Sequence, residues 1–189
     1  MDFRFLFANC IGTAFAILTL YYCGFLSTQL LHPELEIRVI DGDTFVWTQS
    51  LSFWSSSINE RIRLQGIDAP EKKQSFGLES ASYLRTMFDK CDKFQLFLSC
   101  HFSCDRKPRK DLYGRTIAIC YLNGKDIGLS LIEAGLAHPY MTSKSQTKEY
   151  KNAYEKAQQT KKGIWNQKHV ESPSVYRKEV KEKSRHKNK

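Results

Sequence analysis

The stretch EIRVIDGDTFVWT, residues 36–48, contains two runs of β-branched and aromatic residues on either side of an Asp-Gly turn. These runs, Glu36–Ile40 and Thr44–Thr48, have the composition of β-strands. A third run of the same kind covers Ile58–Leu64, after a Ser-rich break. Three short strands in succession, with turn signals between them, predict a curled antiparallel meander.

The following residues add helices and a second pair of strands. Residues 78–90 place apolar side chains on one helical stripe, and the runs Phe94–Cys104 and Arg115–Leu122 indicate a long hairpin with a basic tip. Two more helices are expected, one after an Asp126 N-cap and one from Thr147 to Gly163. Five short strands with about three helices predict an α+β, mainly β domain built on an OB-type five-stranded barrel.

The chain on either side of this domain, which covers residues 35–168, has a different composition. After a short flank of residues 1–4, residues 5–31 contain no charged side chain, a run longer than the ~20 residues that cross a bilayer. We expect a transmembrane anchor there, with a cleaved signal segment as the alternative. Residues 173–189 are rich in Lys and Arg, and we expect them to form a basic, disordered tail.

The formal net charge of +9 falls wholly on residues 32–189, because the N-terminal flank is neutral. The folded part is therefore distinctly basic. Arg4 before the apolar run, and Glu34 and Glu36 soon after it, favour an N-terminus inside the cell. The domain is then expected outside the cytoplasm, membrane-anchored if the apolar run is retained and secreted if it is cleaved.

The cysteines fit an oxidising compartment. Cys91, Cys100, Cys104 and Cys120 follow the apolar run. Their spacing and the lack of suitable partners disfavour zinc, which leaves disulfides or buried free thiols. Cys104 and Cys120 are equidistant from Leu112, so a hairpin folded symmetrically about its tip places them opposite each other. A disulfide between them is predicted, with Cys100 as the rival partner if the hairpin contains a bulge.

Several polar residues stand where a structural role alone explains them poorly. Asp43 follows the Asp-Gly turn, where a strand normally has a residue of higher β propensity. Arg63 precedes Asp68 by five residues, and Glu71 follows a proline that stiffens the turn. Arg115 comes directly after a glycine at the hairpin tip. Taken singly, each has an ordinary explanation, such as a hairpin turn or ion pairing between the arginines and the carboxylates.

Together these pieces resemble the thermonuclease, or staphylococcal nuclease-like, family. The motifs, in order, are Asp-Gly-Asp-Thr at 41–44, Arg-x-x-x-x-Asp-x-Pro-Glu at 63–71, Tyr-Gly-Arg at 113–115, Gly-Leu-Ala at 135–137 and Gly-Ile-Trp at 163–165. The agreement runs from about Ile37 to Trp165, the whole predicted domain. The resemblance implies an OB-type barrel with three helices and a calcium-dependent phosphodiesterase that acts on DNA and RNA.

The resemblance also implies roles for single residues. Asp43, Asp68 and the backbone carbonyl of Ala69 would bind Ca²⁺, an ion that prefers oxygen ligands. Two arginines would hold the scissile phosphate, to which planar guanidinium groups can bind in pairs of hydrogen bonds, and a glutamate would act on the attacking water. The catalytic residues implied in this way are Arg63, Glu71 and Arg115.

Substrate contacts are expected at the hairpin tip and at the barrel rim. Tyr113 and Lys110 are candidates at the tip. Tyr140 is a third candidate if one gap is allowed after Ala137, and its alternative is a tyrosine that covers the rim of the barrel. The expected partners are DNA and RNA, together with the membrane through residues 5–31. No protein partner is inferred, and the protein is expected to be a monomer.

A weakly sequence-selective, exported endonuclease is the function that these residues favour. The alternative is a non-catalytic, membrane-tethered module of OB type that binds nucleic acid or another polyanion. Such a module would be expected to have lost an acidic ligand or an arginine, whereas all five chemical positions are occupied here. A role with an acidic polysaccharide would use the basic surface, but it leaves Asp43 and Glu71 without a stated purpose.

Overall fold

The structure, a computed structural model, describes residues 35–49, 57–94, 101–140 and 147–187. The predicted anchor or signal at residues 5–31 lies outside these ranges. Within them, no helix combines the length and the apolar character that a membrane span requires. The chain divides into two compact units, and the larger one contains the candidate site described below.

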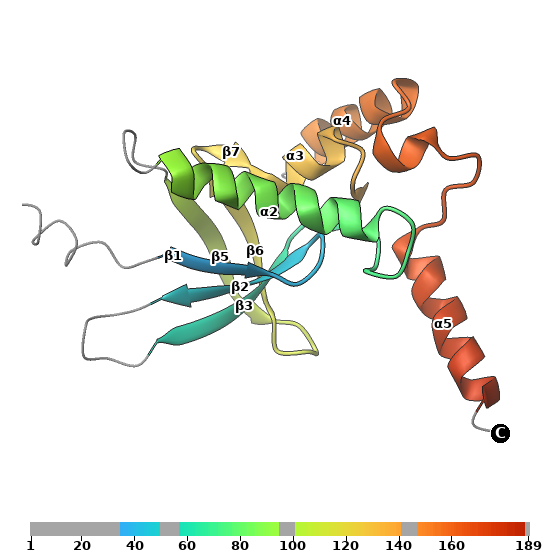
Figure 1. Cartoon of the computed structure of the whole chain (residues 1–189), viewed down its shortest axis with the longest axis horizontal. Helices are drawn as coiled ribbons and strands as arrows, with labels where there is room; N and C mark the ends of the chain where they lie inside the picture. The colour runs from blue at the N-terminus through green and yellow to red at the C-terminus, as the bar shows by residue number, and fades with distance from the viewer. Residues whose placement is uncertain (1–34, 50–56, 95–100, 141–146, 188–189) are drawn as a thin grey trace, which may run out of the picture. The chain divides into compact units, whose positions relative to one another are not determined.

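The main sheet has six strands in the order β1-β2-β3-β6-β5, with the short strand β7 paired to β6 (Figure 1). Strand β3 runs parallel to β6, whereas β5 is antiparallel to β6. The strands are β1 (Leu35–Val39), β2 (Thr44–Gln49), β3 (Ile58–Leu64), β5 (Phe102–Lys110), β6 (Thr116–Leu122) and β7 (Lys125–Asp126). The first three coincide closely with the runs predicted from the sequence.

The α+β class is confirmed, but the described strands of the predicted OB-type barrel do not close. A barrel closes only when its two outer strands pair with each other. Among the described residues, β1 and β5 stand at opposite ends of the strand order and no pairing joins them. A second, two-stranded sheet consists of β4 (Ile67–Asp68) and β8 (His138–Pro139). The arrangement is therefore an open, OB-like mixed sheet.

Four α-helices are described, where the sequence predicts about three. They are α2 (Gly77–Phe94), α3 (Ile127–Glu133), α4 (Thr147–Gln159) and α5 (Pro173–Lys187), with a 3₁₀ turn η1 (Gly163–Asn166) between the last two. Helix α2 lies across the sheet (Figure 1), and its Phe88 ring meets that of Phe45 on β2 edge to face at 5.2 Å. Leu84 of α2 joins the same buried cluster. Burial of this apolar surface is the main favourable contribution to folding.

The hairpin of β5 and β6 differs from the prediction at both ends. Phe94 belongs to the last turn of α2, and the described strand begins at Phe102. The basic segment expected at the tip is instead part of β5, because Lys110 still pairs with Thr116 across an irregularity in register after Arg106. The actual tip is the short segment 111–115.

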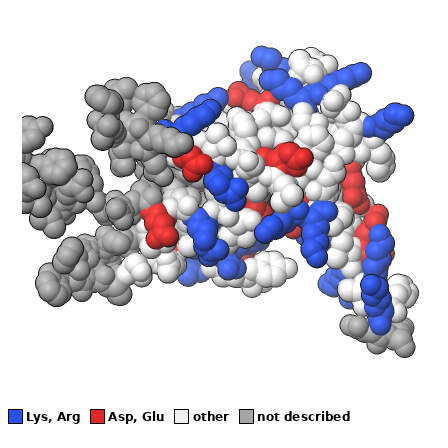
Figure 2. Space-filling model, in the orientation of Figure 1, with Lys and Arg blue, Asp and Glu red and all other residues white. Residues whose placement is uncertain are grey.

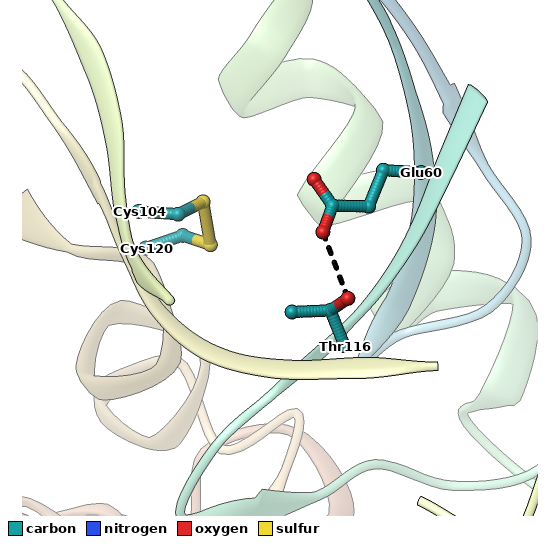
Figure 3. Close-up of a disulfide and its surroundings, with 4 residues drawn as sticks. All are labelled: Glu60, Cys104, Thr116 and Cys120. Atoms are coloured by element: carbon teal, nitrogen blue, oxygen red, sulfur yellow. Dashed lines mark hydrogen bonds between the residues drawn. A yellow bond between two sulfur atoms is a disulfide. The ribbon is translucent and has the colours of Figure 1, made fainter. Parts of the chain in front are cut away.

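The disulfide of this hairpin joins Cys104 on β5 to Cys120 on β6 (Figure 3). The two residues are paired in register, their Cα atoms lie 4.0 Å apart and their sulfur atoms are bonded at 2.07 Å. Further along β6, Thr116 donates a hydrogen bond of 2.8 Å to Glu60 of β3. Cys91 is disulfide-bonded as well. The strands that lead to the hairpin tip are thus covalently joined.

The prediction of a disordered tail after residue 172 is wrong, because residues 173–187 form helix α5. Pro173 stands at the first helical position, where its missing N–H costs nothing. Glu179 and Lys183 form an i,i+4 ion pair at 3.4 Å, and the last turn is basic, which suits the negative end of the helix dipole. The charges that indicated a solvated end therefore also suit a helix.

Two motif glycines, far apart in the sequence, meet where α3 ends and η1 begins. Gly135 and Gly163 have φ angles of +69° and +51°. A Cβ atom on Gly163 would overlap the carbonyl of Gly135, and one on Gly135 would overlap the carbonyl of Lys162. Ile164 donates its backbone N–H to the Gly135 carbonyl at 2.9 Å. Both positions therefore require glycine for conformation and for space.

Candidate active site

Asp43 lies at the start of β2, in the turn that joins it to β1. The turn is closed by the backbone N–H of Ile40, which donates to Thr44 O at 2.9 Å, and by Asp41, whose carboxylate accepts the Asp43 N–H at 3.1 Å. The Asp43 side chain points inward, and the residue is only 3% exposed. An acidic group at this depth needs partners, and the neighbouring strands supply them.

Arg63 of β3 bridges the two buried aspartates. Its Nη1 lies 2.8 Å from Asp43 Oδ1, and its Nη2 lies 2.9 Å from Asp68 Oδ1. Asp68 belongs to β4, just beyond the turn that follows β3, and is 5% exposed. One guanidinium group thus holds together carboxylates that come from different strands.

Ala69 completes the link between the two aspartates. It is buried, and its backbone N–H donates to Asp43 Oδ2 at 3.1 Å. The other oxygen of Asp43 also accepts a hydrogen bond from the Thr44 hydroxyl at 2.9 Å. The predicted role of the Ala69 carbonyl stays a prediction, but the residue stands beside both carboxylates.

Electrostatics at this centre combine burial with ion pairing. Burial raises the pKa of Asp43 to about 7, while Arg63 and the Ala69 N–H oppose the rise. Burial also works against the charge on Arg63, but Asp43 and Asp68 outweigh it and raise the arginine's pKa. The centre therefore holds a permanent cation between two acidic groups, one of which ionises reluctantly.

Arg115 is held at the hairpin tip by Asp111. Asp111 Oδ2 accepts from Arg115 Nε at 2.6 Å, and its Oδ1 accepts the backbone N–H groups of Tyr113 and Arg115, both at 2.9 Å. Burial raises the pKa of Asp111, but these hydrogen bonds and the charge of Arg115 together outweigh it and lower the pKa overall. Arg115 Nη1 also lies 3.4 Å from Thr44 Oγ1, the hydroxyl that donates to Asp43. Arg115 thus borders the aspartate centre.

Glu71 follows Asp68 in the turn after β4. Its backbone N–H donates to Gln74 Oε1 at 3.1 Å, and its side chain is partly exposed. Gln74 in turn donates to the carbonyl of Glu171, just before α5, at 2.8 Å. Glu71 is therefore on the open side of the centre, where water can reach it.

The predicted substrate residues are exposed, and one of them contacts a residue of this centre. Tyr113 and Tyr140 are exposed, and so is Lys110 at the end of β5. The Arg115 guanidinium lies 5.3 Å from the centre of the Tyr113 ring. Tyr140 follows β8 and its backbone N–H donates to the Gly66 carbonyl at 2.7 Å. Among the contacts that the structure describes, Tyr113 is thus the one predicted substrate residue that touches a predicted catalytic side chain.

Arg177 of α5 is a site residue that the motifs do not contain. Its Nη1 lies 2.7 Å from Glu71 Oε1 and 3.1 Å from Asp68 Oδ1, and its Nη2 lies 2.8 Å from Asp68 Oδ2. Hydrogen bonding to Asp68 is the main reason that its pKa is raised. The available signal was weak: a proline that could start a helix, followed by an arginine one turn later.

Comparison with known proteins agrees with the motifs. Residues 61–167, more than half of the chain, match the model of a family described as staphylococcal nuclease homologue. An "Uncharacterized endonuclease" of Haemophilus influenzae is 32% identical over 145 residues, which are 77% of this chain and 72% of the relative. A "Staphylococcal-like nuclease" of Arabidopsis thaliana is 31% identical over 121 residues, 62% of this chain and 33% of the relative.

A third relative, an endonuclease of Bacillus subtilis, is 26% identical over 141 residues, 69% of this chain but 11% of its own length. The matched region thus forms most of one relative and a smaller part of the others. It includes Arg63, Asp68, Glu71 and Arg115, which the structure gathers around one centre. The chain therefore belongs to the staphylococcal nuclease family and is a nuclease, a phosphodiester hydrolase that acts on nucleic acid.

Proposed function

We propose that this nuclease is calcium-dependent, cuts both DNA and RNA with little sequence preference, and works through the centre around Asp43 and Asp68. The observation that carries the proposal is that Arg63 holds one oxygen of each aspartate, at 2.8 and 2.9 Å. Two carboxylates that lie close enough to bind one guanidinium group also lie close enough to bind one metal cation. Single-stranded or locally opened substrates are favoured, because an OB-like groove follows a backbone and stacks bases.

The donor set fits a hard divalent cation. In the described residues, no three His, Cys, Asp or Glu side chains come together as a metal site. Two carboxylates, with a backbone carbonyl such as that of Ala69 and water, still provide the oxygen ligands that Ca²⁺ prefers. When bound between Asp43 and Asp68, the ion would supply positive charge for the phosphoryl oxygens.

The protein groups would carry out the remaining chemistry. Arg63 and Arg115 hold the non-bridging phosphoryl oxygens and stabilise the charge that grows on them in the transition state. Glu71 accepts a proton from the attacking water, whose oxygen forms a new bond to phosphorus. The bond from phosphorus to one sugar oxygen breaks, and that oxygen takes up a proton. Tyr113 and Lys110 contact the flanking nucleotides.

We also propose that the enzyme is exported and anchored in a membrane through residues 5–31. The uncharged run and the Cys104–Cys120 disulfide support this, since disulfides persist in oxidising compartments. Cell fractionation tests the anchor: the full chain is expected in the membrane pellet after a high-salt wash, and its domain is expected to be degraded by protease added outside. Recovery in the soluble fraction inside the cell would contradict both statements.

Nicking of a supercoiled plasmid tests the catalytic proposal. The full chain is expected to nick plasmid and to degrade single-stranded DNA and RNA with Ca²⁺, and to stop when a chelator is added. Glu71→Gln serves as the matched inactive variant. Cleavage that a chelator leaves unchanged would contradict calcium dependence, and tight binding of all three substrates without cleavage would point to the non-catalytic module.

A further inference from the structure

Arg177 reaches the centre from a helix that lies outside the matched family region. It is 109 residues from Asp68 and 106 from Glu71 in sequence. The planar guanidinium binds both oxygens of Asp68 and one oxygen of Glu71, at 2.7 to 3.1 Å. Such a forked contact with a carboxylate is among the stronger polar contacts in proteins.

The oxygens that Arg177 occupies are those that the proposed reaction needs. Asp68 Oδ1 already accepts from Arg63, so both of its oxygens are in use. A divalent cation on Asp68 would be repelled by both the Arg63 and the Arg177 guanidinium groups, and of the two Arg177 is the more exposed, at 43% against 21%, and so the easier to displace. The ion pair with Arg177 stabilises the charged form of Glu71, which makes this carboxylate a weaker base toward a water molecule.

We propose that α5 is an autoinhibitory latch, in which Arg177 competes with a divalent cation for Asp68 and with water for Glu71. The proposal rests on the proposed function of these two carboxylates. In the latched state the centre is neutralised by protein arginines. Binding of a cation displaces Arg177 and opens the centre, and the phosphates of a substrate then offer the arginine new partners.

The packing of α5 makes such a release feasible. Pro173 is its buried residue, whereas the Arg177 side chain is 43% exposed and the residues after it are exposed. A helix with so little buried surface can detach from the domain at a small cost in free energy. Figure 2 shows basic side chains over α5 and α4 on the visible face, with acidic ones between them. These basic side chains attract a polyanion to this face, and its phosphates then offer Arg177 alternative partners.

Calcium titration by calorimetry tests the latch without relying on cleavage. We compare the full chain with Arg177→Gln and with Arg185→Gln, which removes the same charge from the exposed last turn of α5. Arg177→Gln is expected to bind Ca²⁺ about 3- to 30-fold more tightly, the scale for a partly exposed charge-assisted contact. Arg185→Gln is expected to stay within about twofold of the parent, because a distant exposed charge is screened.

Hydrogen exchange supplies a second readout. Addition of Ca²⁺ is expected to speed amide exchange in residues 173–187 of the parent chain, because the latch opens. In Arg177→Gln the exchange is expected to be fast already without Ca²⁺. Arg177→Lys keeps the charge but loses the fork, and its calcium affinity is expected to fall between those of the parent and Arg177→Gln.

Several results would overturn the latch. Equal calcium affinity in the parent and in Arg177→Gln would do so, as would undetectable calcium binding in both. A slower cleavage rate in Arg177→Gln at unchanged calcium affinity would instead make Arg177 a substrate-holding residue. If neither the parent nor Arg177→Gln cleaves nucleic acid but Arg177→Gln binds Ca²⁺ more tightly, the proposed function fails, whereas the competition between Arg177 and the cation for Asp68 stands.

Discussion

Asp111 holds Arg115 at two points, since its Oδ1 accepts the arginine's backbone N–H at 2.9 Å and its Oδ2 accepts Nε at 2.6 Å. The contact fixes the direction of a side chain that would otherwise sample many rotamers. It also leaves the Nη atoms of Arg115 available, and one of them lies 3.4 Å from the Thr44 hydroxyl. Asp111 is thus a positioning residue for the guanidinium at the edge of the centre.

Asp111→Ala is therefore expected to slow cleavage by about 10- to 100-fold, the scale for a misplaced catalytic group. Cleavage of single-stranded DNA at saturating substrate measures the effect on kcat. Asp89→Ala, an exposed acidic residue on α2, is the matched control and is expected to cleave at the parental rate. Equal rates for Asp111→Ala and the parent would show that Arg115 needs no such support.

Glu71→Gln is expected to abolish most activity without loss of stability, because its carboxylate is partly exposed and its isosteric amide fills the same space. The expected loss is about 10² to 10⁴ in rate, typical of removing a general base. Plasmid nicking measures the rate, and urea unfolding checks the fold. A variant that cuts as fast as the parent would remove Glu71 from the mechanism.

Arg63→Ala is expected to lose both activity and stability, in contrast to Glu71→Gln. The guanidinium is mostly buried and is paired with two buried aspartates, so its removal leaves Asp43 and Asp68 short of a partner. The loss in unfolding free energy is expected to be about 2 to 4 kcal/mol, measured by urea denaturation. An unchanged midpoint would show that these ion pairs contribute nothing to the fold.

The N-cap of α3 gives a pH-dependent prediction. Asp126 accepts the Leu129 N–H at 3.1 Å and the Tyr150 hydroxyl at 2.9 Å, but burial raises its pKa above the ordinary 3.8. The folded protein therefore holds this proton more tightly than the unfolded chain. The group's stabilising contribution is complete below pH 3.8 and is lost as the pH rises through the folded-state pKa.

Asp126→Asn cannot ionise, and it keeps an oxygen acceptor for the Leu129 N–H, while its NH₂ group faces the Tyr150 hydroxyl, which can accept as well as donate. The unfolding free energy of this variant, minus that of the parent, is expected to be larger at neutral pH than near pH 3.8. Urea denaturation at both pH values measures the difference. Asp89→Asn, on the exposed face of α2, should show no such trend, and a flat difference for Asp126→Asn would contradict the raised pKa.

Removal of the Cys104–Cys120 bridge is expected to lower stability by up to ~3 kcal/mol, because the bridge closes a loop of 16 residues in the unfolded chain. The double substitution Cys104→Ala with Cys120→Ala tests this by urea unfolding under non-reducing conditions. Mass mapping of peptides from the parent, isolated from an oxidising compartment, should find the two cysteines linked. Free thiols at both positions would contradict the bridge.

Local patterns were enough to predict the strands, and the motifs of the resemblance include the residues that meet around Asp43 and Asp68. The runs before and after Asp43 are short, β-branched and separated by turn residues, and the structure has strands at nearly the same bounds. The motif from Arg63 to Glu71 spans nine consecutive residues, so its side chains lie near one another without help from distant parts of the chain. The N-cap at Asp126 is likewise a local signal, and its side chain does accept from Leu129.

Features that depend on distant contacts could not be predicted in this way. The extension of β5 to Lys110 follows from pairing with Thr116 across an irregular register, which the basic composition of the segment conceals. Helix α5 consists of residues that suit both a solvated tail and a helix. The place of Arg177 beside Asp68 depends on how the last helix docks, and no spacing in the sequence encodes that contact.

The contact between Gly135 and Gly163 has a consequence for recognising distant relatives. The two glycines lie at one backbone crossing, where a side chain at either position would meet backbone atoms of the opposite segment, which no change of side chain there can remove. A relative that lost its acidic or basic residues, and with them its chemistry, would still need this pair in order to form the same crossing. The glycines are therefore a signature of common descent that should persist in inactive members, whereas the charged residues are a signature of activity.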